Sequence, residues 1–222
     1  MKKALVIGGT GATGRQLVQQ LLNSADFQTI TSIGRRPVLD GNEHQKLNDV
    51  VISSMSQLHK TKDLWNGNDV FFNCIGTTRK KAGGARQFVD IELGISRLAA
   101  KMASEANIPQ ASVISANGAN HKAWSIDWIH PLLYTKTMGQ KEQTLVAENE
   151  FKRVSIFRPG MLIRSMEDST LWDNILTSLG LGLQVDILSK SMIIDALRFI
   201  EGNDSKKINY IEGNHAILDL TT

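Results

Sequence analysis

Short apolar runs alternate along the chain with longer segments whose apolar residues recur at helical spacing. This alternation is typical of βαβ units and predicts a parallel sheet flanked by helices. The runs that read as buried strands are Ala4–Ile7, Thr29–Ile33, Val50–Ile52, Val70–Ile75, Ala111–Ser115 and Val154–Phe157. We therefore expect an α/β fold built on a doubly wound parallel sheet.

One-sided apolar stripes mark the helices between these runs. In the segment Ile91–Ala106 the stripe consists of Ile91, Ile95, Leu98, Ala99, Met102 and Ala103. Further helices are predicted over Arg15–Leu22 and over the more polar segment Lys136–Glu148. Near the C-terminus we predict a helix over Ser189–Ile200, capped by its first residue, and a last strand over Ala216–Leu220.

The sequence of 222 residues contains no internal repeat and no Pro- or Ser-rich linker. Its length is near the upper end of one domain, and a chain of this size buries roughly 70% of its unfolded surface. We therefore predict a single domain over residues 1–222. After Gly160 the pattern becomes irregular, and the segment 161–200 is expected to form a small lobe on the substrate side.

Composition and charge narrow the function classes. The single cysteine excludes a disulfide framework and a multi-Cys zinc site. A net charge of +3, with no basic cluster longer than Arg79–Lys81, argues against nucleic acid as a partner. No run approaches the ~20 apolar residues of a membrane span, and the N-terminal apolar run is too short for a signal peptide. We expect a cytoplasmic monomer or homodimer that acts on a small-molecule substrate.

The strongest motif is Gly8-Gly9-Thr10-Gly11-Ala12-Thr13-Gly14, between the first predicted strand and its helix. A strand that turns tightly into a helix needs glycines, and N–H groups at the helix start hold a pyrophosphate. The motif predicts a Rossmann sheet that binds a dinucleotide, and the alternative is a purely structural turn. The predicted cofactor contacts are Gly8, Thr10, Gly11, Ala12, Thr13 and Gly14.

The residues after the second predicted strand indicate which dinucleotide is bound. An NAD site places Asp or Glu about 20 residues after the glycine loop, on the ribose 2′-hydroxyl. This chain has Gly34-Arg35-Arg36-Pro37 there, with no acid. Two guanidinium groups suit a 2′-phosphate, so Arg35 and Arg36 predict NADP(H). The alternative is a pair of solvated loop arginines.

The fourth predicted strand ends beside the crevice in which a doubly wound sheet holds its ligand. Its glycine lets a cofactor lie against the chain, and the threonines and Arg79 that follow offer hydrogen-bond donors. The cysteine reads as a small core residue rather than a nucleophile. The predicted cofactor contacts are Cys74, Ile75, Gly76 and Thr77. The alternative is a Gly-rich surface loop with solvated charges.

A hydroxyl and a phenol are the catalytic candidates. Ser115 ends the fifth predicted strand, and Tyr134 begins a predicted helix. Such a pair suits hydride transfer from a nicotinamide, because Tyr protonates the developing alkoxide while Ser holds the carbonyl oxygen. A nearby ammonium is expected to lower the phenol pKa from ~10 toward neutrality.

Together these motifs resemble the atypical short-chain dehydrogenases/reductases, in particular the Tat-interacting-protein-like oxidoreductases. The similarity covers about residues 4–164, and the string GTTRKKAG is more specific than the glycine loop. The residues that carry it are Gly8–Gly14, Gly34–Arg36, Gly76–Gly83, Ser115–Ala119, Tyr134–Lys136 and Phe157–Gly160. The resemblance implies a Rossmann sheet with NADP(H) in its crevice, and Arg158, Pro159 and Gly160 behind the nicotinamide.

Two departures from the family pattern concern the catalytic region. The family tyrosine is followed four residues later by lysine, and this chain has Met138 there. Lys136, the third catalytic candidate, faces another side of the helix and replaces that lysine only if the helix is distorted near Gly139. Lys141 lies two turns from Tyr134, too far for direct contact.

The second departure is the stretch 120–131, which is longer than in the relatives. Its Trp124, Trp128, His121 and His130 form either a substrate lid or a surface loop packed on the domain. No recurring ligand spacing supports a metal site at His121, Asp127 and His130, so no metal is expected.

The sequence therefore predicts an NADP(H)-dependent oxidoreductase that reduces a small carbonyl compound. A different class remains open because of Met138: a module that binds NADP(H) and reports redox state without chemistry. Isomerase or epimerase chemistry uses the same fold, but the chain shows no extended sugar-nucleotide domain.

Overall fold

The computed structural model describes residues 1–125, 129–163 and 182–222. Its strands alternate with helices, as the apolar pattern predicts. Their bounds are β1 Lys2–Ile7, β2 Phe27–Gly34, β3 Leu47–Val51, β4 Val70–Asn73, β5 Gln110–Ile114, β6 Arg153–Arg158, β7 Met161–Ile163, β8 Gly182–Gln184 and β9 Ile208–Glu212. None of the described helices is long and apolar enough to cross a bilayer.

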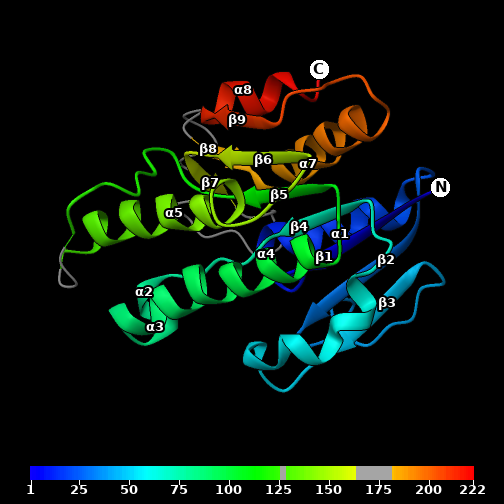
Figure 1. The fold of residues 1–222 in the computed structure, drawn as a ribbon, viewed down its shortest axis with the longest axis horizontal. Coiled ribbons are helices and arrows are strands. Elements are labelled where there is room, and N and C mark those ends of the chain that lie inside the picture. The colour runs from blue at the N-terminus through cyan, green and yellow to red at the C-terminus, as the bar shows by residue number, and fades with distance from the viewer. Residues whose placement is uncertain (126–128, 164–181) are drawn as a thin grey trace.

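Within these residues, seven strands form one parallel sheet in the order β3-β2-β1-β4-β5-β6-β9. Figure 1 shows the sheet running from β3 at one edge to β9 at the other. The strand order reverses beside β1, because the chain first builds outward to β3 and then returns to β4. In such sheets the ligand crevice lies outside the carboxyl ends of the strands at this switch point. This confirms the predicted α/β doubly wound fold.

The helical elements are α1 Ala12–Asn23, η1 Met55–Trp65, α2 Arg79–Ala82, α3 Ala85–Val89, η2 Asp90–Ile95, α4 Ser96–Glu105, α5 His130–Val146, α7 Val185–Ile200 and α8 Gly213–Asp219. Helices α1 and α7 pack against each other on one face of the sheet. The 3₁₀ segment η1 and helices α4 and α5 cover the other face. Strands β7 and β8 form a separate parallel pair.

Alternate residues of the central strand β1 supply both cores. Ala4 and Val6 face the layer of α1 and α7, and Leu5 and Ile7 face the layer of α4 and α5. All four are fully buried, which explains why the strand reads as a continuous apolar run. The crevice at its carboxyl end is thus built on a rigid strand.

Two sequence predictions are wrong. The segment Ala216–Leu220 is not a strand, because its residues through Asp219 lie in α8, and the last strand is β9. Four apolar residues in a segment of five do not distinguish strand from helix. Ser189 is not a helix cap, since α7 begins four residues earlier, at Val185. Its Oγ lies 2.9 Å from the carbonyl oxygen of Thr13, to which it donates a hydrogen bond, and so links α7 to the glycine loop.

The predicted helix over Ile91–Ala106 is present, but the type of helix changes within it. The first part of that segment belongs to η2, a π-helical segment, and α4 follows from Ser96 to Glu105. Wider π turns of this kind occur often at functional sites. The insertion changes which side chains of this segment face α5, and it brings Glu92 into the site described below.

Candidate functional site

The glycine loop forms a tight cradle between β1 and α1. Gly8 has a φ of +78°, and a Cβ there would lie 2.5 Å from the carbonyl carbon of Cys74. A Cβ on Gly14 would lie 2.2 Å from the carbonyl oxygen of Gly8. Both positions therefore exclude a side chain. Gly8 combines a left-handed backbone conformation with a steric clash, whereas at Gly14 the steric clash alone is sufficient.

Gly11 has a different role in the cradle. It is exposed, it caps α1 in an extended conformation (φ −75°), and a Cβ there would lie 3.2 Å from the nearest atom, the carbonyl oxygen of Gly8. The fold can accept a small side chain at Gly11 more easily than at Gly14. Because Gly11 has no side chain, a ligand phosphate can approach the exposed backbone there. The first N–H groups of α1 have no partner within the helix and point toward this surface. The cradle fits a pyrophosphate.

The carboxyl end of β2 carries exposed cations. Arg35 and Arg36 directly follow the strand and are both exposed. Arg15, on the first turn of α1, pairs with Asp40 at 3.3 Å. Sequence reasoning missed this exposed pair. The carboxylate of Asp40 is thus engaged by a guanidinium group on α1.

The loop after β4 is held by two buried charges. The Nζ of Lys141 lies 2.6 Å from the carbonyl oxygen of Ile75, to which it donates a hydrogen bond. The backbone N–H of Thr77 donates to Oε1 of Glu92, at 2.6 Å. Lys141 and Glu92 also pair with each other at 3.0 Å. This loop is therefore fixed on both sides of Gly76 by one ion pair.

Burial makes this pair unusual. The side chain of Lys141 is 0% exposed and that of Glu92 is 3% exposed. Such charges are stable inside a protein only when their partners are complete. Here η2 and α5 contribute one charge each, and the backbone of the Ile75–Thr77 loop provides the remaining hydrogen bonds.

Tyr134 lies on α5, with its ring 5.9 Å from the ring of Phe88. Burial raises the pKa of Tyr134 to about 12, and the negative charge of Glu92 adds to the rise. The sequence prediction of a phenol pKa lowered by an ammonium is therefore wrong. The phenol keeps its proton at neutral pH.

Met138 explains why no cation reaches the phenol from the expected position. It is buried and packs in an apolar cluster with Ala116, Ala119 and Tyr134. Helix α5 continues through Gly139 without a break, so the distortion that Lys136 would need is absent from this described helix. Gly139 instead allows α5 to pack closely against the chain at His121, because a Cβ there would lie 2.1 Å from the His121 backbone nitrogen.

Ser115 is buried at the carboxyl end of β5, and its hydroxyl is already engaged. Its Oγ donates to Oε1 of Glu142, on α5, at 2.6 Å. Arg158 donates two hydrogen bonds to the same carboxylate, from Nε at 2.9 Å and from Nη2 at 2.7 Å. The hydrogen bond to Glu142 raises the pKa of Arg158. In this arrangement Ser115 donates into the protein, and it must rotate before it can donate to a substrate oxygen.

The other predicted contacts near β6 are fixed by the C-terminal elements. The guanidinium group of Arg158 lies 4.7 Å from the ring centre of Tyr210. The N–H of Gly160, which follows Pro159, donates to the side chain of Asn214 at 2.9 Å. These residues therefore form one wall of the region beyond β5 and β6.

Cys74 is a core residue, as the sequence suggests. It is 7% exposed, and burial raises the pKa of its thiol to about 12, with the charge of Lys141 opposing the rise. A thiol that keeps its proton is a poor nucleophile. The backbone of Cys74, by contrast, touches Gly8 and closes one side of the crevice.

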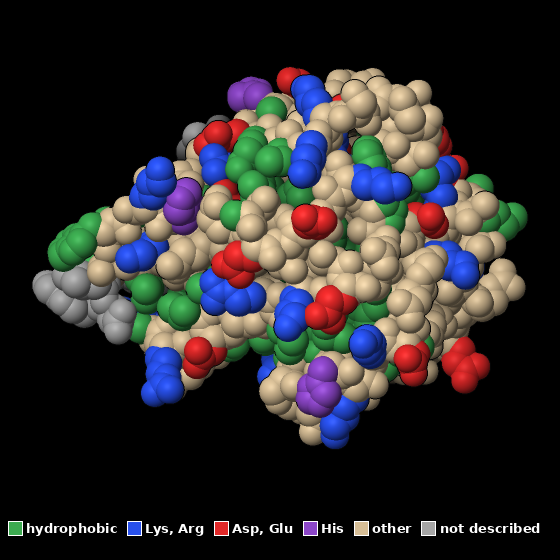
Figure 2. Space-filling view, viewed as in Figure 1, with side chains coloured by type: hydrophobic (Ala, Val, Ile, Leu, Met, Phe, Trp, Pro, Cys, Tyr) green, Lys and Arg blue, Asp and Glu red, His purple; other side chains and the backbone are tan. Residues whose placement is uncertain are grey.

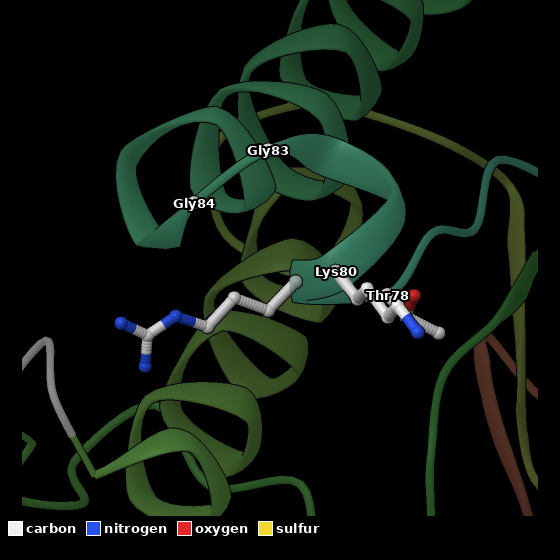
Figure 3. Close-up of a pocket in the computed structure, with 5 residues that line it drawn as sticks. Thr78, Lys80, Gly83 and Gly84 are labelled. Atoms are coloured by element: carbon white, nitrogen blue, oxygen red, sulfur yellow. The ribbon is translucent and has the colours of Figure 1, made fainter.

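An open hollow of about 670 Å³ is lined by residues that directly follow the Cys74–Thr77 loop. Figure 3 shows it beside α2, where Gly83 and Gly84 turn the chain into α3. Thr78, Arg79 and Lys80 also line it, so its wall is basic. Elsewhere on the face drawn in Figure 2, basic and acidic side chains are interspersed.

The stretch 120–131 is only partly described. Trp124 is 68% exposed, whereas Asp127 and Trp128 lie outside the described residues. Neither the lid nor the surface-loop interpretation is therefore tested. In the ranges that the structure describes, no group of three or more His, Cys, Asp or Glu side chains is placed to hold a metal ion.

The structure thus brings together the glycine loop, the Cys74–Thr77 loop, Ser115 and Tyr134 at the carboxyl edge of the sheet, and leaves Lys136 aside. Sequence reasoning did not identify Glu92 and Glu142, and it considered Lys141 only as a partner of Tyr134. Helical spacing from Tyr134 places Lys141 on the same side of α5, but its partner becomes visible only with the π-helical segment η2.

Comparison with known proteins agrees with this geometry. A family model described as NAD(P)H-binding matches residues 8–174. The mitochondrial protein FMP52 of Debaryomyces hansenii is 35% identical over 167 residues, which is 75% of this chain and 69% of that protein. Protein HTATIP2 of Rattus norvegicus is 31% identical over 169 residues, covering 76% of this chain and 66% of that protein.

Solved structures show the same fold at low sequence identity. The oxidoreductase ylbE from Lactococcus lactis aligns over 99% of this chain and 96% of its own, with a TM-score of 0.66 and 15% identity. A short-chain dehydrogenase/reductase superfamily protein from Agrobacterium tumefaciens with bound NAD covers 95% of this chain and 85% of its own, with a TM-score of 0.63 and 13% identity. The chain therefore belongs to the NAD(P)H-binding family and is similar to FMP52 and HTATIP2.

Proposed function

We propose that this chain binds NADP(H) and reduces a small carbonyl compound. The observation that carries the proposal is a half-buried, protonated phenol on α5 that shares the carboxyl edge of the sheet with a glycine cradle. Glu92 links the two, because it raises the pKa of Tyr134 and also holds the Thr77 N–H beside the cradle. A proton donor next to a dinucleotide site is the arrangement that carbonyl reduction requires.

The residues of the chain have distinct roles in this reaction. A bound nicotinamide would supply the hydride to the carbonyl carbon. Tyr134 donates its phenolic proton to the carbonyl oxygen, a role that requires the protonated phenol present at neutral pH. Ser115 orients that oxygen once its hydroxyl rotates away from Glu142. Reduction is thereby favoured over alcohol oxidation, which needs an ionised base.

The proposed preference for NADP(H) rests on Arg35 and Arg36. Both are exposed at the end of β2, where they meet a 2′-phosphate, and no carboxylate directly follows that strand to bind a 2′-hydroxyl. Since a hydrogen bond to a charged group contributes about 1.5–3 kcal/mol, losing one should cost about tenfold or more in affinity for NADPH. Arg79 and Lys80, in the basic hollow, are placed to attract an anionic group on the substrate.

The reaction is tested by NADPH oxidation with a panel of aldehydes and quinones. The wild type should turn over, and Tyr134→Phe should lose about 10²–10⁴-fold in rate while still binding NADPH. Tyr210→Phe removes the other tyrosine of the chain and should retain activity. Equal rates for the wild type and Tyr134→Phe would contradict the proposed role.

Cofactor choice is tested by titrating NADPH and NADH against the wild type and Arg35→Ala. The wild type should prefer NADPH, and Arg35→Ala should lose most of that preference. Arg198→Ala, which removes an exposed charge from α7, is the matched control and should keep it. Equal affinity of the wild type for both cofactors would refute the phosphate contact.

Met138 supports a second function, a module that binds NADP(H) without turnover. It occupies the position of the expected lysine with an apolar side chain packed on Tyr134. NADPH binding of equal strength in the wild type and Tyr134→Phe, with no oxidation by either, would favour this reading. The compartment stays a prediction: the sequence predicts the cytoplasm, whereas the FMP52 relative is named mitochondrial.

A further inference from the structure

The strongest feature outside the proposed chemistry is the ion pair between Glu92 and Lys141. Neither side chain is placed to contact substrate, and both are almost completely buried. A buried pair is often no more stabilising than apolar residues of the same size, so stability alone is a weak reason for it. Its hydrogen bonds suggest a more specific role.

Both charged side chains form hydrogen bonds with the backbone of the same three residues, Ile75–Thr77. Lys141 donates to the carbonyl oxygen of Ile75, and Glu92 accepts from the N–H of Thr77. Between them lies Gly76, where a Cβ would be 3.9 Å from Oε1 of Glu92. A peptide segment held at its carbonyl and its N–H group by opposite charges has little freedom to rotate.

The restrained segment Ile75–Thr77 lies where a bound dinucleotide would pass. It follows β4, on the side of the switch point opposite to β2. Because Arg35 and Arg36 follow β2, the adenosine half of a dinucleotide lies on that side, and the loop after β4 borders the other half. The preceding residue, Cys74, contacts Gly8 through its backbone. The ion pair that holds Ile75–Thr77 therefore also restrains a neighbour of the glycine cradle.

We propose that the Glu92–Lys141 ion pair is a positioning device that holds Ile75–Thr77 against the nicotinamide half of the dinucleotide. This inference rests on the proposed binding of a nicotinamide dinucleotide. The pair also joins the π-helical segment η2 to α5, which carries Tyr134. It thus connects the cofactor loop to the helix of the proposed proton donor, from a lysine three residues beyond Met138.

The experiment compares two buried carboxylates. Glu92→Gln removes the carboxylate charge at nearly unchanged shape and leaves Lys141 without its counter-charge. Asp195→Asn is the matched control, since the side chain of Asp195 is equally buried, at 3% exposed, and pairs with the buried Arg153 at 2.7 Å. That second pair joins α7 to the opposite, amino end of β6. Each variant is titrated calorimetrically with NADPH and with adenosine 2′,5′-bisphosphate, which occupies only the adenosine half; 5′-AMP replaces it if the wild type prefers NADH.

Glu92→Gln should weaken NADPH binding by about tenfold or more, as expected when a positioning contact is displaced, and change affinity for the bisphosphate by less than about twofold. Asp195→Asn should lower the melting temperature and leave both affinities unchanged. Lys141→Met is the second variant, with the same expected pattern, and it decides the matter if Glu92→Gln does not fold.

Two results would overturn the inference. Unchanged NADPH affinity in Glu92→Gln would show that the loop is positioned without the pair. A parallel loss for NADPH and the bisphosphate would show a general structural role. A wild type that binds no pyridine dinucleotide at all would instead refute the proposed function itself.

Discussion

The ionisation of Tyr134 gives the sharpest quantitative prediction. Burial, aided by the charge of Glu92, raises its pKa to about 12 from the ordinary value of 10.0. Because one pKa unit corresponds to about 1.4 kcal/mol, the folded state favours the protonated phenol by about 2–3 kcal/mol more than the unfolded chain does. This stabilisation is complete below the unfolded pKa of about 10 and is lost as the pH rises from about 10 to 12.

The assay is an alkaline titration followed by the ultraviolet absorbance of tyrosinate. The chain has only two tyrosines, Tyr134 and Tyr210. Burial also raises the pKa of Tyr210, but that side chain is 45% exposed. Tyr134→Phe should remove the later transition, and Tyr210→Phe the earlier one. If the transition missing from Tyr134→Phe lies near pH 10, the protonated-donor argument is refuted.

Three further outcomes follow from the same geometry. Gly139→Ala should destabilise the fold by about 1–3 kcal/mol in urea unfolding, because its Cβ would meet the backbone nitrogen of His121 at 2.1 Å; unchanged stability would contradict the close approach. Cys74 should resist thiol reagents at pH 8 until the protein unfolds, since burial raises its pKa to about 12, and rapid native-state labelling would contradict this. Met138→Lys should lower the pKa of Tyr134 by about 1–3 units in the alkaline titration, whereas Met138→Leu should leave it unchanged.

The apolar pattern is sufficient for the parallel sheet because its strands are buried on both faces. Residues 4–7 of β1 are fully buried, so their side chains must all be apolar. The glycine loop is equally readable, since Gly14 admits no Cβ. The apolar pattern is less informative in the C-terminal region. The Ala216–Leu220 segment is short, and whether it forms helix or strand depends on how it packs against α7.

The site shows where sequence reasoning ends. Ser115 and Tyr134 are identifiable because strand ends and helix starts near them are predictable. Lys141 is not, because its charge is stabilised by Glu92, which η2 places opposite α5. Spacing along one helix cannot reveal a partner on another, and a π-helical insertion shifts every side chain after it. Burial is the main cause of the raised pKa of Tyr134, and the charge of Glu92, which η2 places near α5, adds to it.

Calorimetric titration of NADPH into the wild type and Gly11→Ala tests the central claim most directly. Gly11 is exposed and extended, and its Cβ would lie 3.2 Å from the nearest atom, so the fold should accept alanine with little loss of melting temperature. The account predicts measurable binding heat for the wild type and binding weaker by about tenfold or more for the variant, whose methyl group stands where the diphosphate must approach. Wild-type protein that gives no heat with millimolar NADPH or NADH, or a Gly11→Ala variant that binds as tightly as the wild type, would contradict it.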